Sequence, residues 1–278
     1  MLNPHKKNIS DFFYNEHKIP FHQRSYIWSK EVLTEFWEDI YYVHENRNEK
    51  YMHFLGSIIT TKNFNSNNII DGQQRITTLV LFVLATVKIL WDELEENTPQ
   101  HRNPGVSGEE WQDFQTKLRR HKDEVIRELE FMFRHDSIEG VYSLKLTPSN
   151  KDQQGFNKVL KDISPVLRDK IKKFGLNSSE SSQKEISRVF HAYEEIKKII
   201  HKNFYPKGAI SSSHVQGQLI NFLKDIKENV RFVDVSISDG DPTSIFNNLN
   251  TKGVPLSTLD ITKNYVFQDV EENDEVRL

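Results

Sequence analysis

The residues with the clearest chemical potential are five consecutive ones, Asp71-Gly72-Gln73-Gln74-Arg75. They follow the apolar pair Ile69-Ile70 and open a long stretch with helical spacing of apolar residues. A glycine there permits a tight turn and a close backbone approach. The first turn of a helix offers unpaired N–H groups and a partial positive charge, which favour phosphate. Because Arg75 adds a planar cation suited to phosphate, the pattern predicts a phosphate-binding turn.

The side chains of this turn suggest a division of roles. Asp71 can hold a divalent metal ion, bind a ribose hydroxyl or act as a base. Gln73 and Gln74 both donate and accept hydrogen bonds, so they can orient a water or read a base edge. We therefore take Asp71, Gln73 and Gln74 as candidate catalytic residues. A structural interpretation stays open, because Asp-Gly is a common turn and Asp a good N-cap. The turn is not a Walker loop, whose G-x-x-x-x-G-K-[ST] pattern is absent.

A second unusual stretch, Ile19 to Trp28, sets polar side chains among large aromatic ones. Its polar members are His22, Gln23 and Arg24, and Tyr26 follows them. Aromatic and guanidinium groups together can stack on a base and hold a phosphate. Equally, the rings can pack at the edge of the core while Arg24 forms a structural salt bridge.

A third polar stretch lies near the C-terminal end, from Ile245 to Asn264. It contains the loop Asn250-Thr251-Lys252-Gly253, followed by Asp260 and Lys263, which share a face if that segment is helical. The loop can close over a nucleotide, or it can connect two helices with Gly253 as the C-cap.

The elements that position these stretches form an α+β pattern. Strands are expected over 52–60, 69–70, 142–147 and 230–236. Helices are expected over 8–16, 29–44, 74–96, 109–134, 151–174, 186–204, 215–228 and 257–267. We divide the chain into a small mixed α/β core (1–96), a mostly helical region (97–229), and a strand with helices that can return to the core (230–278). One continuous domain is the alternative.

The composition excludes several classes of function. The 278 residues include no cysteine, which rules out disulfides, thiolate metal sites and cysteine nucleophiles. The net charge of -3 gives no overall basic field, so any DNA contact must come from a local patch. The run Ile76 to Trp91 is too short and too interrupted to cross a bilayer, and is expected to be a core helix. With no apolar leader at the N-terminus, we expect a cytoplasmic protein and no membrane partner.

Together these stretches resemble the N-terminal domain of GmrSD-type proteins, which are modification-dependent (type IV) restriction systems of bacteria. Four sequence patterns carry the resemblance: I-P-x-x-Q-R-x-Y-x-W, F-L-G-S-I, I-D-G-Q-Q-R-x-T-T-L and F-x-x-L-N-x-x-G-x-x-L-x-x-x-D-x-x-K. They stand in the same order at Ile19–Trp28, Phe54–Ile58, Ile70–Leu79 and Phe246–Lys263. The resemblance covers roughly residues 8–92 and 230–267, while the helical middle carries no motif that we can place.

The resemblance implies a ParB/sulfiredoxin-like α/β core with a large helical insertion and C-terminal helices. It also implies binding and hydrolysis of a nucleoside triphosphate, often GTP, coupled to recognition or cleavage of modified double-stranded DNA. Mg²⁺ would accompany the nucleotide, with Asp71 as its ligand. By the same resemblance the nucleotide-binding residues are Gly72, Arg75, Thr77, Thr78, Gln23, Arg24, Asn250 and Lys263. The DNA-binding candidates are His22, Gln23, Arg24 and Tyr26.

One departure from the family pattern concerns the nuclease. Many members continue into an HNH-type nuclease domain, but no His-Asn-His arrangement follows the late motif here. We therefore expect the nuclease to be another domain or subunit, and this chain not to be an HNH nuclease. Three alternatives to a nucleoside triphosphatase stay open: a sensor of DNA modification, a ParB-like nuclease, and a scaffold for a partner nuclease. A homo-oligomer is compatible with each.

Overall fold

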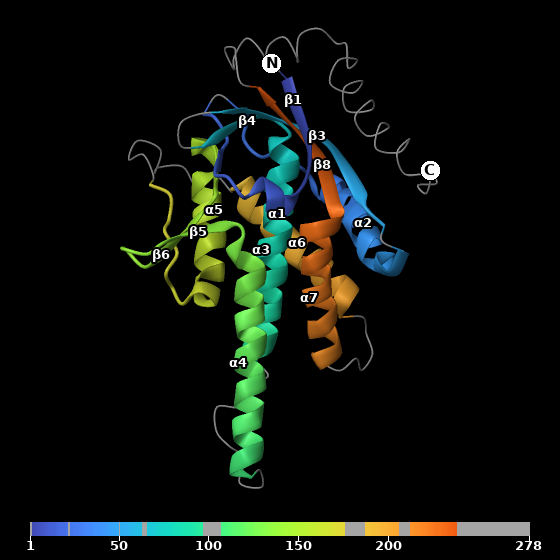
Figure 1. Cartoon of the computed structure of the whole chain (residues 1–278), viewed down its shortest axis with the longest axis vertical. Coiled ribbons are helices and arrows are strands. Elements are labelled where there is room, and N and C mark those ends of the chain that lie inside the picture. The colour runs from blue at the N-terminus through green and yellow to red at the C-terminus, as the bar shows by residue number, and fades with distance from the viewer. Residues whose placement is uncertain are drawn as a thin grey trace.

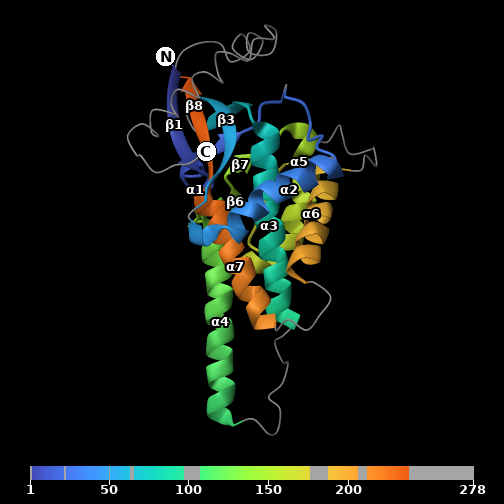
Figure 2. The ribbon, with the colours of Figure 1, turned by 90° about the vertical axis from the view of Figure 1, so that its right-hand side faces the viewer.

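The computed structural model describes residues 2–21, 23–49, 51–62, 66–96, 107–175, 187–205 and 212–237. In these residues a mixed sheet lies at one end of a helical body, and one helix projects from the opposite end (Figures 1 and 2). The expected α+β fold class is confirmed.

The main sheet has six strands in the order β1-β8-β3-β4-β2-β7. β8 lies antiparallel to β1 and parallel to β3, and β3 and β4 form an antiparallel pair. β2 is parallel to both β4 and β7. The strands span Leu2–Asn8 (β1), His17–Lys18 (β2), His53–Lys62 (β3), Asn67–Asp71 (β4), Leu146–Thr147 (β7) and Val230–Ile237 (β8). The sheet therefore draws its strands from the two ends of the described chain and from its middle.

A second, two-stranded sheet is a hairpin of β5 (Phe133–Asp136) and β6 (Val141–Leu144). Its turn contains Gly140, whose φ is +65°.

The helical body is built around one central helix. The helices span Ile9–Phe12 (α1), Lys30–Glu45 (α2), Gln73–Glu96 (α3), Gly108–Glu130 (α4), Asn150–Ile163 (α5), Arg188–Phe204 (α6) and Ser212–Asn229 (α7). Short 3₁₀ turns follow α2 at Arg47–Glu49 (η1) and α5 at Ser164–Leu167 (η2). α3 contacts α4, α5, α6 and α7 and buries most of its side chains, which confirms the expected core helix. None of the described helices has the length and apolar character needed to cross a membrane.

The main sheet is apolar on both faces. Ile58, Ile69 and Phe232 belong to the large core shared with the helices. The alternate positions point the other way, because successive side chains of a strand face opposite sides. On that side a second buried cluster contains Ile59, Ile70, Val233, Val235 and Ile237. β4 is thus buried on both faces just before it reaches Asp71.

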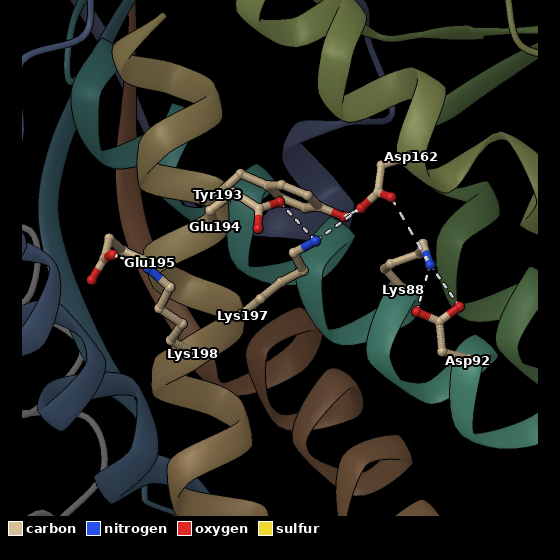
Figure 3. A network of polar contacts seen from close by, with 8 residues as sticks. All are labelled: Lys88, Asp92, Asp162, Tyr193, Glu194, Glu195, Lys197 and Lys198. Carbon is tan, nitrogen blue, oxygen red and sulfur yellow. Dashed lines mark hydrogen bonds and ion pairs between the residues drawn. The ribbon is translucent and has the colours of Figure 1, made fainter. Parts of the chain in front are cut away.

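A polar network ties α5 to α3 and α6 (Figure 3). The Tyr193 hydroxyl donates to Asp162 Oδ2 over 2.8 Å, and Lys197 Nζ lies 3.1 Å from the same oxygen. Lys88 of α3 pairs with Asp92 at 2.6 Å and lies 4.0 Å from Asp162 Oδ1. The carboxylate of Asp162, which is 30% exposed, is therefore held by side chains of α3 and α6.

Charged and titratable side chains are also buried in the sheet. Asp234 of β8 pairs with Lys7 at 2.6 Å and accepts from the Thr60 hydroxyl at 2.7 Å. His17 of β2 is fully buried, its ring is stacked on Phe12, and its Nε2 lies 2.8 Å from the Phe12 carbonyl oxygen. Burial lowers the pKa of His17 to about 4.

Among the differences between the expected and the observed elements, three have a clear physical reason. β1 was not expected, because it is an edge strand that contains Pro4 and mostly polar residues instead of an apolar alternation. The helix expected over 151–174 ends at Ile163, since Pro165 follows and disfavours α-helix at the residue before it. The strand expected over 142–147 is two strands, and its hairpin partner β5 was read as the end of a helix.

Candidate functional site

The predicted turn lies where β4 passes into α3, at the sheet end of the central helix (Figure 1). Gly72 has a φ of +85°, in the region that only glycine adopts readily. A Cβ atom on Gly72 would lie 2.2 Å from Ile58 Cδ1 and 3.3 Å from Ile58 Cα. The glycine is therefore required twice, for its backbone conformation and for its contact with β3.

Contacts with β3 hold the Arg75 side chain beside the same turn. Its Nη1 donates to the Leu55 carbonyl at 2.5 Å, and its Nη2 lies 3.7 Å from Asp71 Oδ2. The pairing of β3 with β8 shifts register between Phe54 and Ser57, which marks a bulge. A Cβ on Gly56, inside that bulge, would lie 2.6 Å from Arg75 Nη1. The F-L-G-S-I pattern thus makes room for the guanidinium of Arg75.

The guanidinium of Arg75 is partly exposed to solvent, and the side chain of Asp71 is more exposed. The side chain of Arg75 is 27% exposed and that of Asp71 is 58% exposed. Burial lowers the pKa of Arg75, and the nearby carboxylate of Asp71 acts in the opposite direction. Together they present one cation and one anion beside the first turn of α3.

The glutamines of the two motifs join the turn to the Ile19–Trp28 stretch. Gln74 accepts from the Ile27 N–H at 3.0 Å and donates to the Ser25 carbonyl at 3.2 Å. Gln73 donates to the Arg24 carbonyl at 3.4 Å. From the other side, Gln23 is buried and donates to the Ile70 carbonyl at 2.9 Å. The two stretches, about 50 residues apart, therefore form one structural unit through side-chain to backbone contacts.

Tyr26 extends this unit into the core. It is 1% exposed, and its hydroxyl lies 2.7 Å from the Thr78 hydroxyl, which donates to the Gln74 carbonyl at 2.8 Å. Burial raises the pKa of Tyr26. In this structure no base could stack on its ring. Thr77 is likewise buried on α3.

Sequence reasoning missed Asp152, a buried carboxylate from α5. Both of its oxygens lie 3.1 Å from the Tyr26 N–H, and the Ser149 hydroxyl donates to it at 3.0 Å. Burial raises the pKa of Asp152. The signal was weak, since an isolated Asp in the first turn of a helix normally reads as a favourable charge near the helix start.

The remaining candidates differ in their accessibility. The Arg24 side chain is exposed, whereas its backbone is held by Gln73. His22, Asn250 and Lys263 lie outside the described residues. Two surface grooves run between α2 and α6 and share Lys30 and Glu195, but no residue of the turn lines either of them.

A metal ion at the turn would find few protein ligands. The described residues contain no group of three or more His, Asp or Glu side chains arranged to hold one. Asp71 is the exposed carboxylate of the turn. Such a site suits Mg²⁺, which commonly takes one or two carboxylates, substrate phosphates and several waters.

Comparison with known protein families decides the relationship of the chain. The family described as "GmrSD restriction endonuclease, N-terminal domain" matches residues 7–267. The chain belongs to this GmrSD N-terminal domain family. Comparison with curated proteins gave no match. The match runs continuously through the helical middle, where sequence reasoning found no motif. Membership of the GmrSD family supports a role in a restriction system.

Proposed function

We propose that this GmrSD-family chain is the nucleotide-using sensor of a restriction system, and that it binds and hydrolyses a nucleoside triphosphate at the turn between β4 and α3. One observation carries the proposal. Gly72 has no side chain to cap the first turn of α3, and Arg75 is fixed beside that turn by the Leu55 carbonyl. A helix start preceded by glycine and with a fixed guanidinium beside it suits phosphate. GTP is favoured because of the family resemblance.

The side chains divide into two groups in this proposal. Gln74 has its side-chain carbonyl and amide engaged with Ile27 and Ser25, and Thr78 is bonded to Tyr26. We assign these residues, with the buried Gln23, to positioning the site. The groups that meet the ligand are those with exposed surface: Asp71, Arg75 and Arg24.

Hydrolysis in this site would be an in-line displacement. A water attacks the γ-phosphorus, the bond to the β,γ-bridging oxygen breaks, and a nucleoside diphosphate and inorganic phosphate leave. Asp71 would orient the water, and Arg75 would stabilise the charge that develops on the phosphoryl oxygens. Asp71 would also hold Mg²⁺, which supplies further charge compensation when bound.

A second candidate function is a sensor of DNA modification without nucleotide hydrolysis. It is favoured by the exposure of Arg24 between two exposed apolar side chains, Phe21 and Ile27. Here the turn would bind a DNA phosphate. A partner HNH nuclease, in the same protein or in another subunit, belongs to both candidate functions.

Calorimetry separates the two functions. GTP, ATP, CTP and UTP are titrated with and without Mg²⁺ into the wild type, Arg24→Ala and a control, Arg119→Ala, whose exposed side chain lies on α4. We expect one nucleotide to bind, roughly tenfold or more weaker binding to Arg24→Ala, since a charge-assisted hydrogen bond contributes about 1.5–3 kcal/mol, and no change in the control. Phosphate release by Asp71→Asn should fall strongly below wild type. If no nucleotide binds and DNA binds without one, the second function is correct.

A further inference from the structure

The middle of the chain holds a concentration of positive charge. Residues 151–173 contain seven Lys or Arg and three Asp, so their net formal charge is +4, whereas the whole chain carries -3. The segment comprises α5, η2 and the chain that returns beside α5. The chain therefore has a local region of positive charge although its overall charge is negative.

Three of these cations share one face of α5. At 3.6 residues per turn, Lys151, Lys158 and Lys161 fall within roughly 80° of the helix circumference and span about 15 Å along its axis. All three side chains are exposed. The opposite face of α5, with Phe156, Leu160 and neighbours, is buried in the core.

Three further cations come from the returning chain, which is held in place by backbone contacts. Asn157 of α5 exchanges two hydrogen bonds with the backbone of Phe174, at 2.8 and 2.9 Å. Tyr142 of β6 donates to the Lys170 carbonyl at 2.6 Å and accepts from the Lys172 N–H at 2.8 Å. Figure 1 shows this chain running beside α5 on its β6 side. Arg168, Lys170 and Lys173 on it are exposed.

The acidic residues of the segment do little to offset this charge. Asp152 is turned inward to the Tyr26 N–H, and Asp162 is bonded to Tyr193 and Lys197 (Figure 3). Asp169 alone of the three is exposed. In the described part of the chain, six cations have no carboxylate within ion-pair distance: Lys151, Lys158, Lys161, Arg168, Lys170 and Lys173. Lys158 Nζ lies 5.7 Å from the centre of the Phe190 ring. Like charges gathered without anionic partners still repel one another, so ion pairing does not account for this array.

We propose that these six residues, the α5 cationic face, bind the phosphate backbone of double-stranded DNA without reading its sequence or modification. A duplex carries one negative charge per about 1.7 Å, so a surface of this length meets several phosphates at once. Single strands are usually bound with aromatic platforms, and the exposed aromatic side chains of the described residues lie elsewhere, none on α5 or the returning chain. The face therefore fits the backbone of a duplex.

This inference goes beyond the nucleotide site and gives the helical middle a role. Lys151 lies next to Asp152, which binds the Tyr26 backbone, so the cationic face begins beside the Ile19–Trp28 stretch. The starts of α3 and α5 also lie at the same end of the molecule in both views (Figures 1 and 2). DNA on the α5 cationic face would thus pass close to the turn that we assign to the nucleotide.

Fluorescence anisotropy with an unmodified, labelled duplex of about 30 base pairs tests the proposal at about 50 and 200 mM salt. The variant is the triple Lys151→Glu, Lys158→Glu, Lys161→Glu. The matched control reverses three exposed cations of α4, Arg119→Glu, Arg120→Glu, Arg127→Glu, and changes the net charge by the same amount. The triple Lys→Gln version at 151, 158 and 161 is measured as well, in case charge reversal disturbs α5.

We expect the wild type to bind duplex DNA with a steep salt dependence. Both α5 variants should bind at least tenfold more weakly at low salt, with a slope shallower by roughly 0.9 for each phosphate that the variant no longer neutralises, while the control changes little. Equally weakened binding in the α5 and α4 variants, or wild-type binding by both α5 variants, would overturn the proposal. If the wild type binds no DNA, the proposal is wrong, and an acidic protein surface becomes the alternative partner of the α5 cationic face. Nucleotide binding should be unchanged in the α5 variants, so failure here is distinguishable from failure of the proposed function.

Discussion

The Asp71–Arg75 turn and the α5 cationic face use polar residues in opposite ways. At the turn, nearly every polar side chain is bonded to a neighbouring backbone group, and only Asp71, Arg75 and the adjoining Arg24 keep exposed surface. On the α5 face, six cations have no anionic partner in the described chain. The first is a constructed site whose geometry depends on each hydrogen bond, and the second is a field whose effect depends on the number of charges.

The difference determines how each region should respond to change. A constructed site fails when one supporting hydrogen bond is removed, because its groups must hold a defined geometry. A charged face weakens in proportion to the charges removed and responds to salt. Single substitutions should therefore be enough to impair the turn. The α5 cationic face should respond measurably only to multiple charge changes and to ionic strength.

The largest effect is expected at Gly72. Gly72→Ala places a Cβ 2.2 Å from Ile58 Cδ1 at a φ of +85°. Backbone strain of this kind costs about 1–3 kcal/mol, and overpacking a well-filled site adds about 1–3 kcal/mol. We expect urea unfolding to show a loss of roughly 3 kcal/mol or more, by addition of those two costs.

Gly140→Ala is the matched control for Gly72→Ala. Gly140 also has a positive φ, of +65°, but apart from its chain neighbours no residue lies within 4 Å of the site of its Cβ. Gly140→Ala should lower the free energy of unfolding only by the cost of backbone strain, about 1 kcal/mol. Equal losses at the two glycines would mean that the packing of the turn against β3 is not tight.

A change of pH should act on the buried His17 of β2. His17 has a pKa of about 4 in the fold, with burial as the main cause, against 6.5 for the free side chain. As pH falls through 6.5 the unfolded chain takes up a proton that the folded chain does not, so stability is lost between pH 6.5 and about 4. The loss should reach about 2 kcal/mol by about pH 5.

Urea denaturation at about pH 7 and pH 5 measures this effect, with His17→Gln as the comparison. The variant should be less stable overall but less sensitive to pH. His53, whose pKa is also lowered by burial, leaves a residual slope of the same sign. If the stability of His17→Gln falls between about pH 7 and pH 5 as much as that of the wild type, His17 is not the group that causes the pH dependence.

The smallest effect on nucleotide binding should come from the link between the two regions. Asp152→Ala leaves the Tyr26 N–H without its acceptor, and we expect about 1–3 kcal/mol of lost stability and roughly tenfold weaker nucleotide binding, equivalent to about 1.4 kcal/mol. Asp162→Ala breaks the hydrogen bonds with Tyr193 and Lys197 and should cost similar stability without changing nucleotide affinity. If both variants bind nucleotide equally well, α5 does not help to position the site.

Much of this fold could be read from local patterns. The apolar spacing of α3 and the Ile69-Ile70 strand before Asp71 predicted the strand, turn and helix that contain the site. What could not be predicted depends on partners far away in the sequence. β1 becomes a strand by pairing with β8, and the α5 face is evident only once Asp152 is seen buried and Asp162 bonded to Tyr193 and Lys197.

The same distinction applies to the site residues. The family resemblance grouped Gln23, Arg24 and the Asp71–Arg75 turn, and the structure brings them together through the Ile70 and Arg24 carbonyls. Residue type alone could not separate supporting from ligand-facing groups. Gln73 and Gln74 are identical in type, but the Gln74 hydrogen bonds are shorter and involve both ends of its amide.

The most direct test of the central claim is the affinity of the wild type and Arg75→Ala for GTP with Mg²⁺, by calorimetry on folded protein. Arg75 joins the helix start to β3 and is the cation that we assign to the phosphates. We predict that the wild type binds GTP and that Arg75→Ala, with its thermal unfolding still cooperative, binds roughly a hundredfold or more weakly, equivalent to about 2.7 kcal/mol. A folded Arg75→Ala that binds GTP as the wild type does would contradict the assignment of the turn as the nucleotide site.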